Sequence, residues 1–72
     1  MRYIVAQEEH ECSYCKHLIE KADICVQSEG TRWLFWHCEY SNWKDCFHNR
    51  FGDSIIHRPR MTKTVLNKLE SL

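Results

Sequence analysis

The first half of the chain carries apolar residues at the spacing of short β-strands. Residues 3–6 favour an opening strand that ends where a polar stretch begins. Ile24 and Val26 lie two residues apart, residues 28–31 contain turn-forming side chains, and residues 32–36 are rich in aromatic rings. This order predicts a β-hairpin whose second strand is buried on both faces.

Further along, the apolar spacing changes to that of a helix. Three aromatic residues lie at i, i+4 and i+8: Trp43, Phe47 and Phe51. Ser41 or Asn42 can cap the start of this helix, and Gly52 can end it. The pattern therefore predicts a helix over residues 42–51.

The last residues carry a second helical pattern. Its apolar stripe consists of Met61, Val65, Leu69 and Leu72. Leu66 lies beside the stripe, and Thr62 or Thr64 can start the helix. We expect an amphipathic helix over residues 61–72, after an irregular basic connector over residues 53–60.

The chain has 72 residues, five of them cysteines and five histidines. A chain of this size buries only about 60% of its unfolded surface, so its fold needs stabilisation beyond its hydrophobic core. Three tryptophans fit positions in that small core: Trp33, Trp36 and Trp43. The whole of residues 1–72 reads as one domain, because no linker, repeat or low-complexity tract divides it.

The expected cellular compartment decides whether disulfides or a bound metal supply this additional stability. The opening residues 1–6 contain few strongly apolar side chains and are soon followed by acidic ones, so we expect no signal peptide. No apolar run approaches the ~20 residues of a membrane span. We therefore expect the cytoplasm or another reducing intracellular compartment, where cysteines bind metals more often than they pair.

Cys12 and Cys15 are separated by two residues, the spacing that lets two thiolates reach one tetrahedral Zn²⁺ from a tight turn. The alternatives are two unrelated buried cysteines or a redox pair. A redox pair begins a helix within a βαβ pattern, whereas residues 16–23 lead into a hairpin. We expect this pair to form a zinc knuckle.

The remaining ligands must come from five candidates: Cys25, His37, Cys38, Cys46 and His48. Cys46 is the strongest, because it lies near the start of the predicted helix on the same face as Phe47. His37 and Cys38 are adjacent at the end of the predicted hairpin, so a regular strand presents only one of them to the site. Both are ordinary zinc ligands, and we favour His37 with Cys38 as the alternate.

Other cysteines and histidines fit different roles. Cys25 alternates with apolar neighbours and reads as a small packed residue. His48 lies about 200° around the predicted helix from Cys46, so we expect it to be exposed or hydrogen-bonded. His10 and His17 flank the knuckle as solvated groups or as supports for the ligands.

The order of Cys-x-x-Cys, hairpin, Trp36-His37 and Cys46-Phe47 resembles treble-clef zinc fingers of the LIM and PARP type over about residues 10–52. The resemblance implies a small α+β fold in which a histidine closes the hairpin and a cysteine opens the helix. Those families place two residues between this histidine and cysteine, whereas eight separate them here. We expect one structural Zn²⁺, bound by Cys12, Cys15, His37 and Cys46.

The formal net charge is zero, but the charge is unevenly distributed. Residues 1–29 carry three basic and six acidic groups, whereas residues 44–72 carry six basic and three acidic groups. The basic end suggests an anionic partner, and we expect nucleic-acid binding. The candidate contacts are Arg50, Arg58, Arg60, Lys63 and Lys68.

Two other function classes bear on the same residues. A protein partner can dock on the apolar stripe of the last helix, which makes an adaptor or regulator the alternative function. The stripe can equally cover the domain's own hairpin. We expect no catalysis and no small-molecule substrate, because four protein ligands leave a zinc ion no open position and the chain is too small for a separate cleft.

Overall fold

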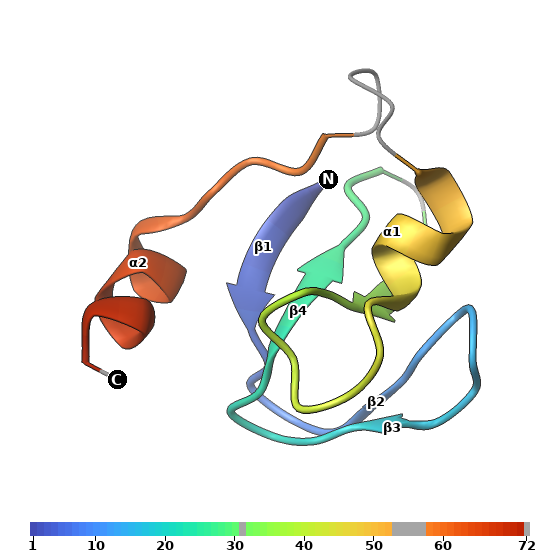
Figure 1. Ribbon diagram of the computed structural model, residues 1–72, viewed down its shortest axis with the longest axis horizontal. Helices are drawn as coiled ribbons and strands as arrows, with labels where there is room; N and C mark the ends of the chain where they lie inside the picture. The colour runs from blue at the N-terminus through green and yellow to red at the C-terminus, as the bar shows by residue number, and fades with distance from the viewer. Residues whose placement is uncertain (31, 53–57, 72) are drawn as a thin grey trace.

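The computed structural model describes residues 1–30, 32–52 and 58–71. These residues form a small α+β fold, as predicted, and Figure 1 shows its arrangement. The elements in chain order are β1 (Arg2–Val5), β2 (His10–Glu11), β3 (Leu18–Ile19), β4 (Ile24–Gln27), β5 (Phe35–His37), α1 (Cys46–Phe51) and α2 (Lys63–Glu70). Within this described part of the chain, no helix has the length and apolar character needed to cross a membrane.

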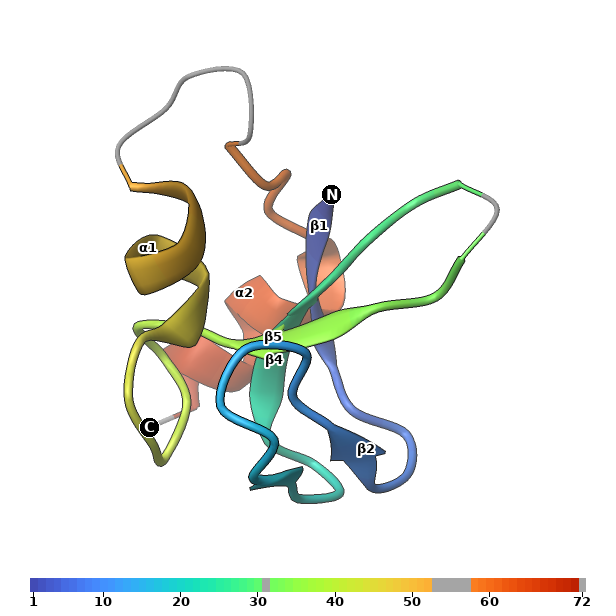
Figure 2. The same cartoon turned by 90° about the vertical axis from the view of Figure 1, so that its right-hand side faces the viewer.

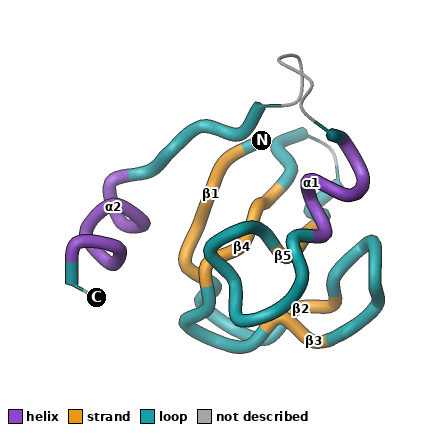
Figure 3. The backbone as a smooth tube through the Cα atoms, viewed as in Figure 1, coloured by secondary structure: helices purple, strands orange, loops and turns teal. Residues whose placement is uncertain are grey.

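Two antiparallel sheets build the fold (Figure 3). The larger has the order β1-β4-β5, so the predicted hairpin is β4 with β5, and the predicted opening strand is β1. The smaller pairs β2 with β3 and carries the predicted knuckle at its tip. Because β4 is the central strand of the larger sheet, three of its four residues are buried.

The register of the larger sheet divides its side chains between two faces. One face, called here the His37 face, consists of Arg2, Ile4, Cys25, Gln27, Phe35 and His37. The opposite face, called the Trp36 face, consists of Tyr3, Val5, Ile24, Val26 and Trp36. The chemistry predicted from the sequence therefore belongs to one face, and most of the aliphatic side chains belong to the other.

Helix α1 packs on the Trp36 face at the β5 edge. The Trp36 ring meets Phe47 and Phe51 edge-on, with ring centroids 5.9 and 5.3 Å apart. The helix begins at Cys46 rather than at residue 42, because Asp45 is the N-cap and its carboxylate accepts a hydrogen bond from the His48 amide at 3.0 Å. Gly52 ends the helix as predicted, with a φ of 66° that glycine adopts without strain.

Helix α2 packs against β1, the opposite edge strand of the sheet (Figure 1). Val65 is 0% exposed and anchors the helix, while Met61 and Leu66 remain exposed. The helix is shorter than the predicted 61–72: Thr62 is its N-cap residue, and the Thr62 hydroxyl donates to the Tyr3 carbonyl instead of to the helix. Leu72, the last residue of the predicted stripe, lies outside the described residues.

The connector before α2 adds to the β1 edge. Tyr3 donates its amide to the Arg60 carbonyl, and Arg60 donates its amide to the Met1 carbonyl, both at 2.9 Å. These bonds give β1 a partner on the side that β4 leaves open, which protects an edge strand from pairing with another chain. Residues 53–57 of the predicted connector lie outside the described residues.

The structure corrects the prediction that all three tryptophans belong to the core. Trp36 is buried, but Trp33 is 61% exposed and Trp43 is 47% exposed. Trp33 precedes β5, which begins at Phe35 rather than at residue 32. Trp43 lies in the loop before α1, whereas the sequence predicted a helix that began at residue 42 and included Trp43. Both errors have one cause, because aromatic spacing alone does not show where an element begins.

Candidate metal centre

The tip of the β2–β3 hairpin is a tight turn that aims two thiols inward. The Lys16 amide donates to the Cys12 carbonyl and the Cys12 amide donates to the His17 carbonyl, both at 3.0 Å. Lys16 closes the turn with a φ of 66°, a left-handed conformation that is unfavourable for a residue with a side chain. Cys12 is fully buried and Cys15 is half-buried, so this knuckle presents both sulfurs to the interior.

A short bridge to the larger sheet places the knuckle beside β5. Cys12 pairs with Phe35 in a parallel bridge, and the Ser13 amide donates to the Phe35 carbonyl at 2.8 Å. His37 lies two residues beyond Phe35 on the same face of the strand, so its ring is directed toward the two thiols. The sequence contained no signal for this bridge, because it joins backbone atoms of two distant segments.

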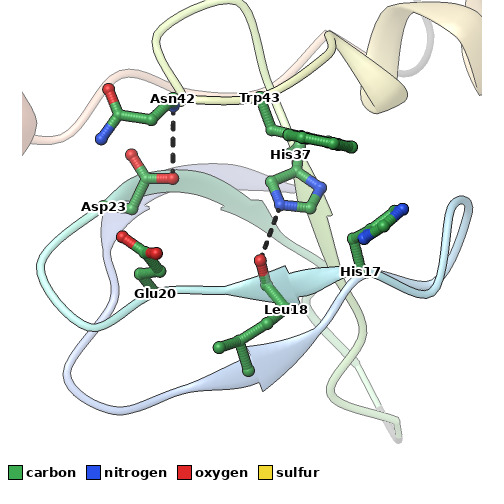
Figure 4. A pocket seen from close by; sticks show the side chains of 7 residues that line it. All are labelled: His17, Leu18, Glu20, Asp23, His37, Asn42 and Trp43. Atoms are coloured by element: carbon green, nitrogen blue, oxygen red, sulfur yellow. Dashed lines mark hydrogen bonds between the residues drawn. The ribbon is translucent and has the colours of Figure 1, made fainter.

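The orientation of the His37 ring is set by its second nitrogen. The Nε2–H group donates to the Leu18 carbonyl oxygen of β3 at 3.1 Å, as Figure 4 shows. A carbonyl oxygen only accepts hydrogen bonds, so this contact leaves the Nδ1 lone pair free for a metal. Metal-binding histidines in proteins are commonly held by such a bond to a carbonyl or carboxylate.

Cys46, the fourth ligand expected from the sequence, is the first residue of α1. It follows a loop over residues 38–45 that folds back on itself through Ser41. The Ser41 hydroxyl donates to the Ile24 carbonyl, and the Ser41 amide donates to the Cys38 carbonyl at 3.0 Å. This compact loop explains how eight intervening residues still bring Cys46 close to His37.

The structure thus brings together the four residues favoured from the sequence, called here the metal group: Cys12, Cys15, His37 and Cys46. Their ligand atoms all lie within 4.8 Å of one another, close enough to hold one metal ion. His37 Nδ1 is 3.4 Å from Cys15 Sγ and 3.8 Å from Cys46 Sγ. A tetrahedral zinc ion with Zn–S of ~2.3 Å and Zn–N of ~2.0 Å separates sulfur from nitrogen by about 3.6 Å.

The surroundings of these thiols affect their ionisation unequally. Burial opposes ionisation of Cys12, but hydrogen bonds from the backbone of Cys15, His37 and Tyr14 prevail and lower its pKa to about 7. Burial and the adjacent Cys15 and Cys12 thiols raise the pKa of Cys46 to about 12. Three thiols at such close range repel one another when ionised, and a cation among them removes that repulsion.

The two other cysteines do not belong to the group. Burial raises the pKa of Cys25 to about 12 and that of Cys38 to about 11. The Cys38 thiol, the alternate ligand from the sequence, instead donates to the Ile24 carbonyl at 3.5 Å. Cys38 lies just beyond the end of β5, and its thiol is not among the clustered ligand atoms. Cys25 is fully buried, as expected of a packed residue.

The remaining histidines do not join the group, and His48 is exposed on α1. His10 stacks on Phe35 with centroids 3.6 Å apart and an interplanar angle of 9°. His17 lies against Trp43, with centroids 4.6 Å apart. Figure 4 shows His17 and Trp43 near the His37 ring. These residues line a hollow of about 250 Å³ together with Glu20 and Asp23.

The five basic residues proposed from the sequence as nucleic-acid contacts are spread over both helices and the connector. The Arg60 guanidinium pairs with Glu29 and lowers the pKa of that carboxyl. The Lys68 ammonium donates to the Ala22 carbonyl, and the Arg50 guanidinium lies 4.9 Å from the centroid of the Phe51 ring. Arg58 and Lys63 are exposed, next to the part of the connector that pairs with β1. Arg50 and Lys68 belong to helices that pack at opposite edge strands of the larger sheet, so the five groups do not form one patch.

Comparison with models of protein families, with curated proteins and with solved structures finds no match for this chain. Its function is therefore inferred from its own geometry.

Proposed function

We propose that this protein is a non-catalytic recognition module whose fold is stabilised by one structural Zn²⁺ bound to Cys12, Cys15, His37 and Cys46. The observation that carries the proposal is the convergence of three thiols and one imidazole nitrogen within 4.8 Å. Three Cys ligands with one His ligand form an ordinary structural zinc shell. The bond from His37 Nε2 to the Leu18 carbonyl supports it further, because it directs Nδ1 toward the thiols.

The arrangement of these ligands favours a treble-clef-like site. A knuckle supplies Cys12 and Cys15, the second strand of the β4–β5 hairpin supplies His37, and the first residue of α1 supplies Cys46. This is the order that the resemblance to LIM and PARP-type fingers implies. The folded loop over residues 38–45 is the feature that departs from those families.

A structural role follows from the number of ligands. Four protein side chains complete a tetrahedral shell, so a zinc ion held by them has no position left for a water or a substrate. Three of the four ligands, Cys12, His37 and Cys46, are at most 1% exposed, so most of the site is shielded from bulk solvent. The zinc ion is accordingly proposed to hold the knuckle, β5 and α1 together and to take no part in a reaction.

Zinc content and folding of the wild-type protein test this proposal together. Native mass spectrometry is expected to find one zinc ion per chain, and circular dichroism is expected to show loss of structure when a chelator removes it. Structural zinc contributes apparent free energies of ~10–16 kcal/mol, which is comparable to the whole stability of a domain. A chain that stays folded without metal would contradict the proposal.

For the recognised partner we propose nucleic acid. The basic half of the chain supports this choice, with exposed Arg50, Arg58 and Lys63 as groups able to contact phosphates. Docking of a protein on α2 is less favoured, because Val65, the centre of its apolar stripe, is fully buried against the protein's own sheet. A polar substitution at Val65 would therefore disturb folding as well as any partner.

Salt dependence of binding tests the nucleic-acid part. A labelled oligonucleotide is expected to bind at low ionic strength and to dissociate as salt rises, because phosphate contacts release counterions. The double variant Arg58→Ala/Lys63→Ala is expected to bind more weakly and with a shallower salt dependence. Absence of any binding at low salt would overturn this part and leave the zinc proposal standing.

A further inference from the structure

The His37 face of the larger sheet is more deeply buried at one end than at the other: Cys25 and His37 are buried, whereas Arg2, Ile4 and Gln27 are half-buried. Near the metal group, His37 bonds to Leu18 and His10 stacks on Phe35, so the β2–β3 hairpin lies against this end. Toward the start of β1 the same face is open, and Arg2, Ile4 and Gln27 line a hollow of about 490 Å³. Figure 2 shows that the chain between β4 and β5 extends away from the sheet, and Trp33 of this segment lines the hollow.

An exposed tryptophan forms one wall of the hollow. Trp33 comes from the β4–β5 loop and is the most exposed large apolar side chain among the described residues, at 61%. Leaving such a ring in water forgoes the free energy that its burial would contribute. Next to it the stacked pair of His10 and Phe35 offers a second flat aromatic surface. Flat rings at the edge of an open groove are suited to stacking with planar ligands.

The floor of the hollow carries a positioned cation. The Arg2 guanidinium donates twice to the Gln27 side-chain oxygen, with both distances 3.1 Å. It also lies 3.9 Å from Glu29, which the Met1 amino group and Arg60 neutralise further. Three positive groups, from Met1, Arg2 and Arg60, therefore lie around the Glu29 carboxylate, and Glu8 is the one acidic residue in the lining of the hollow. The surplus positive charge favours an anionic ligand.

The hollow continues along β1 to the start of α2. A second hollow of about 350 Å³ shares Arg2, Ile4 and Gln27 with the first and ends at Thr62 and Thr64. The Thr62 side chain makes no capping hydrogen bond to α2, so it leaves the amides of the first turn to another acceptor. A helix start with free amides favours a phosphate group, in agreement with the charge of Arg2.

We propose that this groove binds single-stranded nucleic acid, with a base stacked on Trp33 and the backbone following Arg2 toward the start of α2. The inference depends on the proposed nucleic-acid function and places it on the open part of the His37 face, which reaches the start of α2. Aromatic platforms combined with a basic track are the usual means of binding single strands without sequence preference. A duplex keeps its bases stacked on one another, so it cannot use Trp33 in this way.

Fluorescence anisotropy with a labelled oligothymidine about twelve nucleotides long tests the groove. Trp33→Ala is expected to weaken binding about tenfold, because stacking of one base on an aromatic side chain contributes ~1–3 kcal/mol. Trp33→Phe is expected to retain part of the affinity. Trp43→Ala is the matched control, because Trp43 is also an exposed tryptophan but lines the hollow beside His17, away from the groove.

The outcomes separate the groove from the broader function. Wild-type protein that binds no oligonucleotide at low salt would overturn both proposals. Two results would overturn the proposed groove and leave nucleic-acid binding in place. One is an equal loss of affinity in Trp33→Ala and Trp43→Ala. The other is equal affinity of the wild-type protein for the single strand and for a matched duplex. Zinc content and circular dichroism of each variant show that the fold is intact, so a loss specific to Trp33→Ala reports on the groove itself.

Discussion

The two helices of this chain are held in place by different interactions. Helix α1 has six residues, and its first residue is Cys46 of the metal group. Helix α2 has eight residues, and it is anchored by Val65, which is fully buried against the sheet. Neither is long enough to be stable alone. The half of the molecule around α1 should therefore depend on metal, and the half around α2 on apolar packing.

Replacing a ligand of the metal group has the largest expected effect. Cys46→Ala is expected to lose the bound zinc and with it most of the structure, since structural zinc supplies on the order of 10 kcal/mol. Cys38→Ala is the matched control, because Cys38 is equally buried but lies outside the group. It is expected to keep one zinc and to cost no more than about 2 kcal/mol of unfolding free energy.

Native mass spectrometry and thermal denaturation followed by circular dichroism measure both variants. If Cys46→Ala kept its zinc and its melting temperature, α1 would not depend on the metal, and the contrast between the two helices would fail.

The metal group shows which ligands could be predicted from the sequence. The four members of the metal group could be chosen beforehand, because coordination restricts both residue type and local spacing. Cys12 and Cys15 were recognisable from their separation alone. His37 and Cys46 were recognisable only through the elements predicted around them, a strand end and a helix start.

Other features were not predictable, because they depend on contacts between distant segments. Pairing of β1 with β4, and of Cys12 with Phe35, leaves no mark on either segment. The start of α1 was misplaced because Ser41, Asn42 and Asp45 are all residues that cap helices. Only the fold shows that the Ser41 hydroxyl bonds to the Ile24 carbonyl, which leaves Asp45 as the cap.

Truncating Val65, the buried residue that anchors α2, has the next largest expected effect on stability. Val65→Ala is expected to lower the free energy of unfolding by about 2 kcal/mol, from the lost burial and the cavity left behind. Leu66→Ala, on the exposed side of the same helix, is expected to change it by less than about 0.5 kcal/mol. Chemical denaturation measures both, and native mass spectrometry is expected to find one zinc ion in each. Loss of zinc from Val65→Ala would show that the two halves are not separable.

The cap of α1 tests how firmly Cys46 is positioned. Asp45→Ala removes the acceptor of the His48 amide and is expected to cost about 1 kcal/mol. Asp45→Asn keeps an acceptor oxygen and is expected to cost less. Competition with a chromogenic chelator is expected to show weaker zinc binding for Asp45→Ala than for Asp45→Asn, because the helix start holds a ligand. Equal zinc affinity of the two variants would mean that the metal orders α1 without help from its cap.

The smallest expected effect is a gain in stability at the knuckle. Lys16 adopts a φ of 66°, and the left-handed conformation costs a residue with a Cβ atom about 1–2 kcal/mol. Glycine removes that cost but gains freedom in the unfolded chain, which offsets about 0.4–1 kcal/mol. Lys16→Gly is therefore expected to raise the free energy of unfolding of the zinc-bound protein by about 0.5 kcal/mol.

Lys21→Gly is the control for this substitution, because Lys21 is an exposed lysine without a positive φ. It carries the entropic cost of glycine with no strain to relieve, so chemical denaturation is expected to show it less stable than wild type. A destabilised Lys16→Gly would mean that the Lys16 side chain itself contributes to the knuckle. A stabilised one would show that the half held by the metal tolerates backbone strain, because coordination outweighs it.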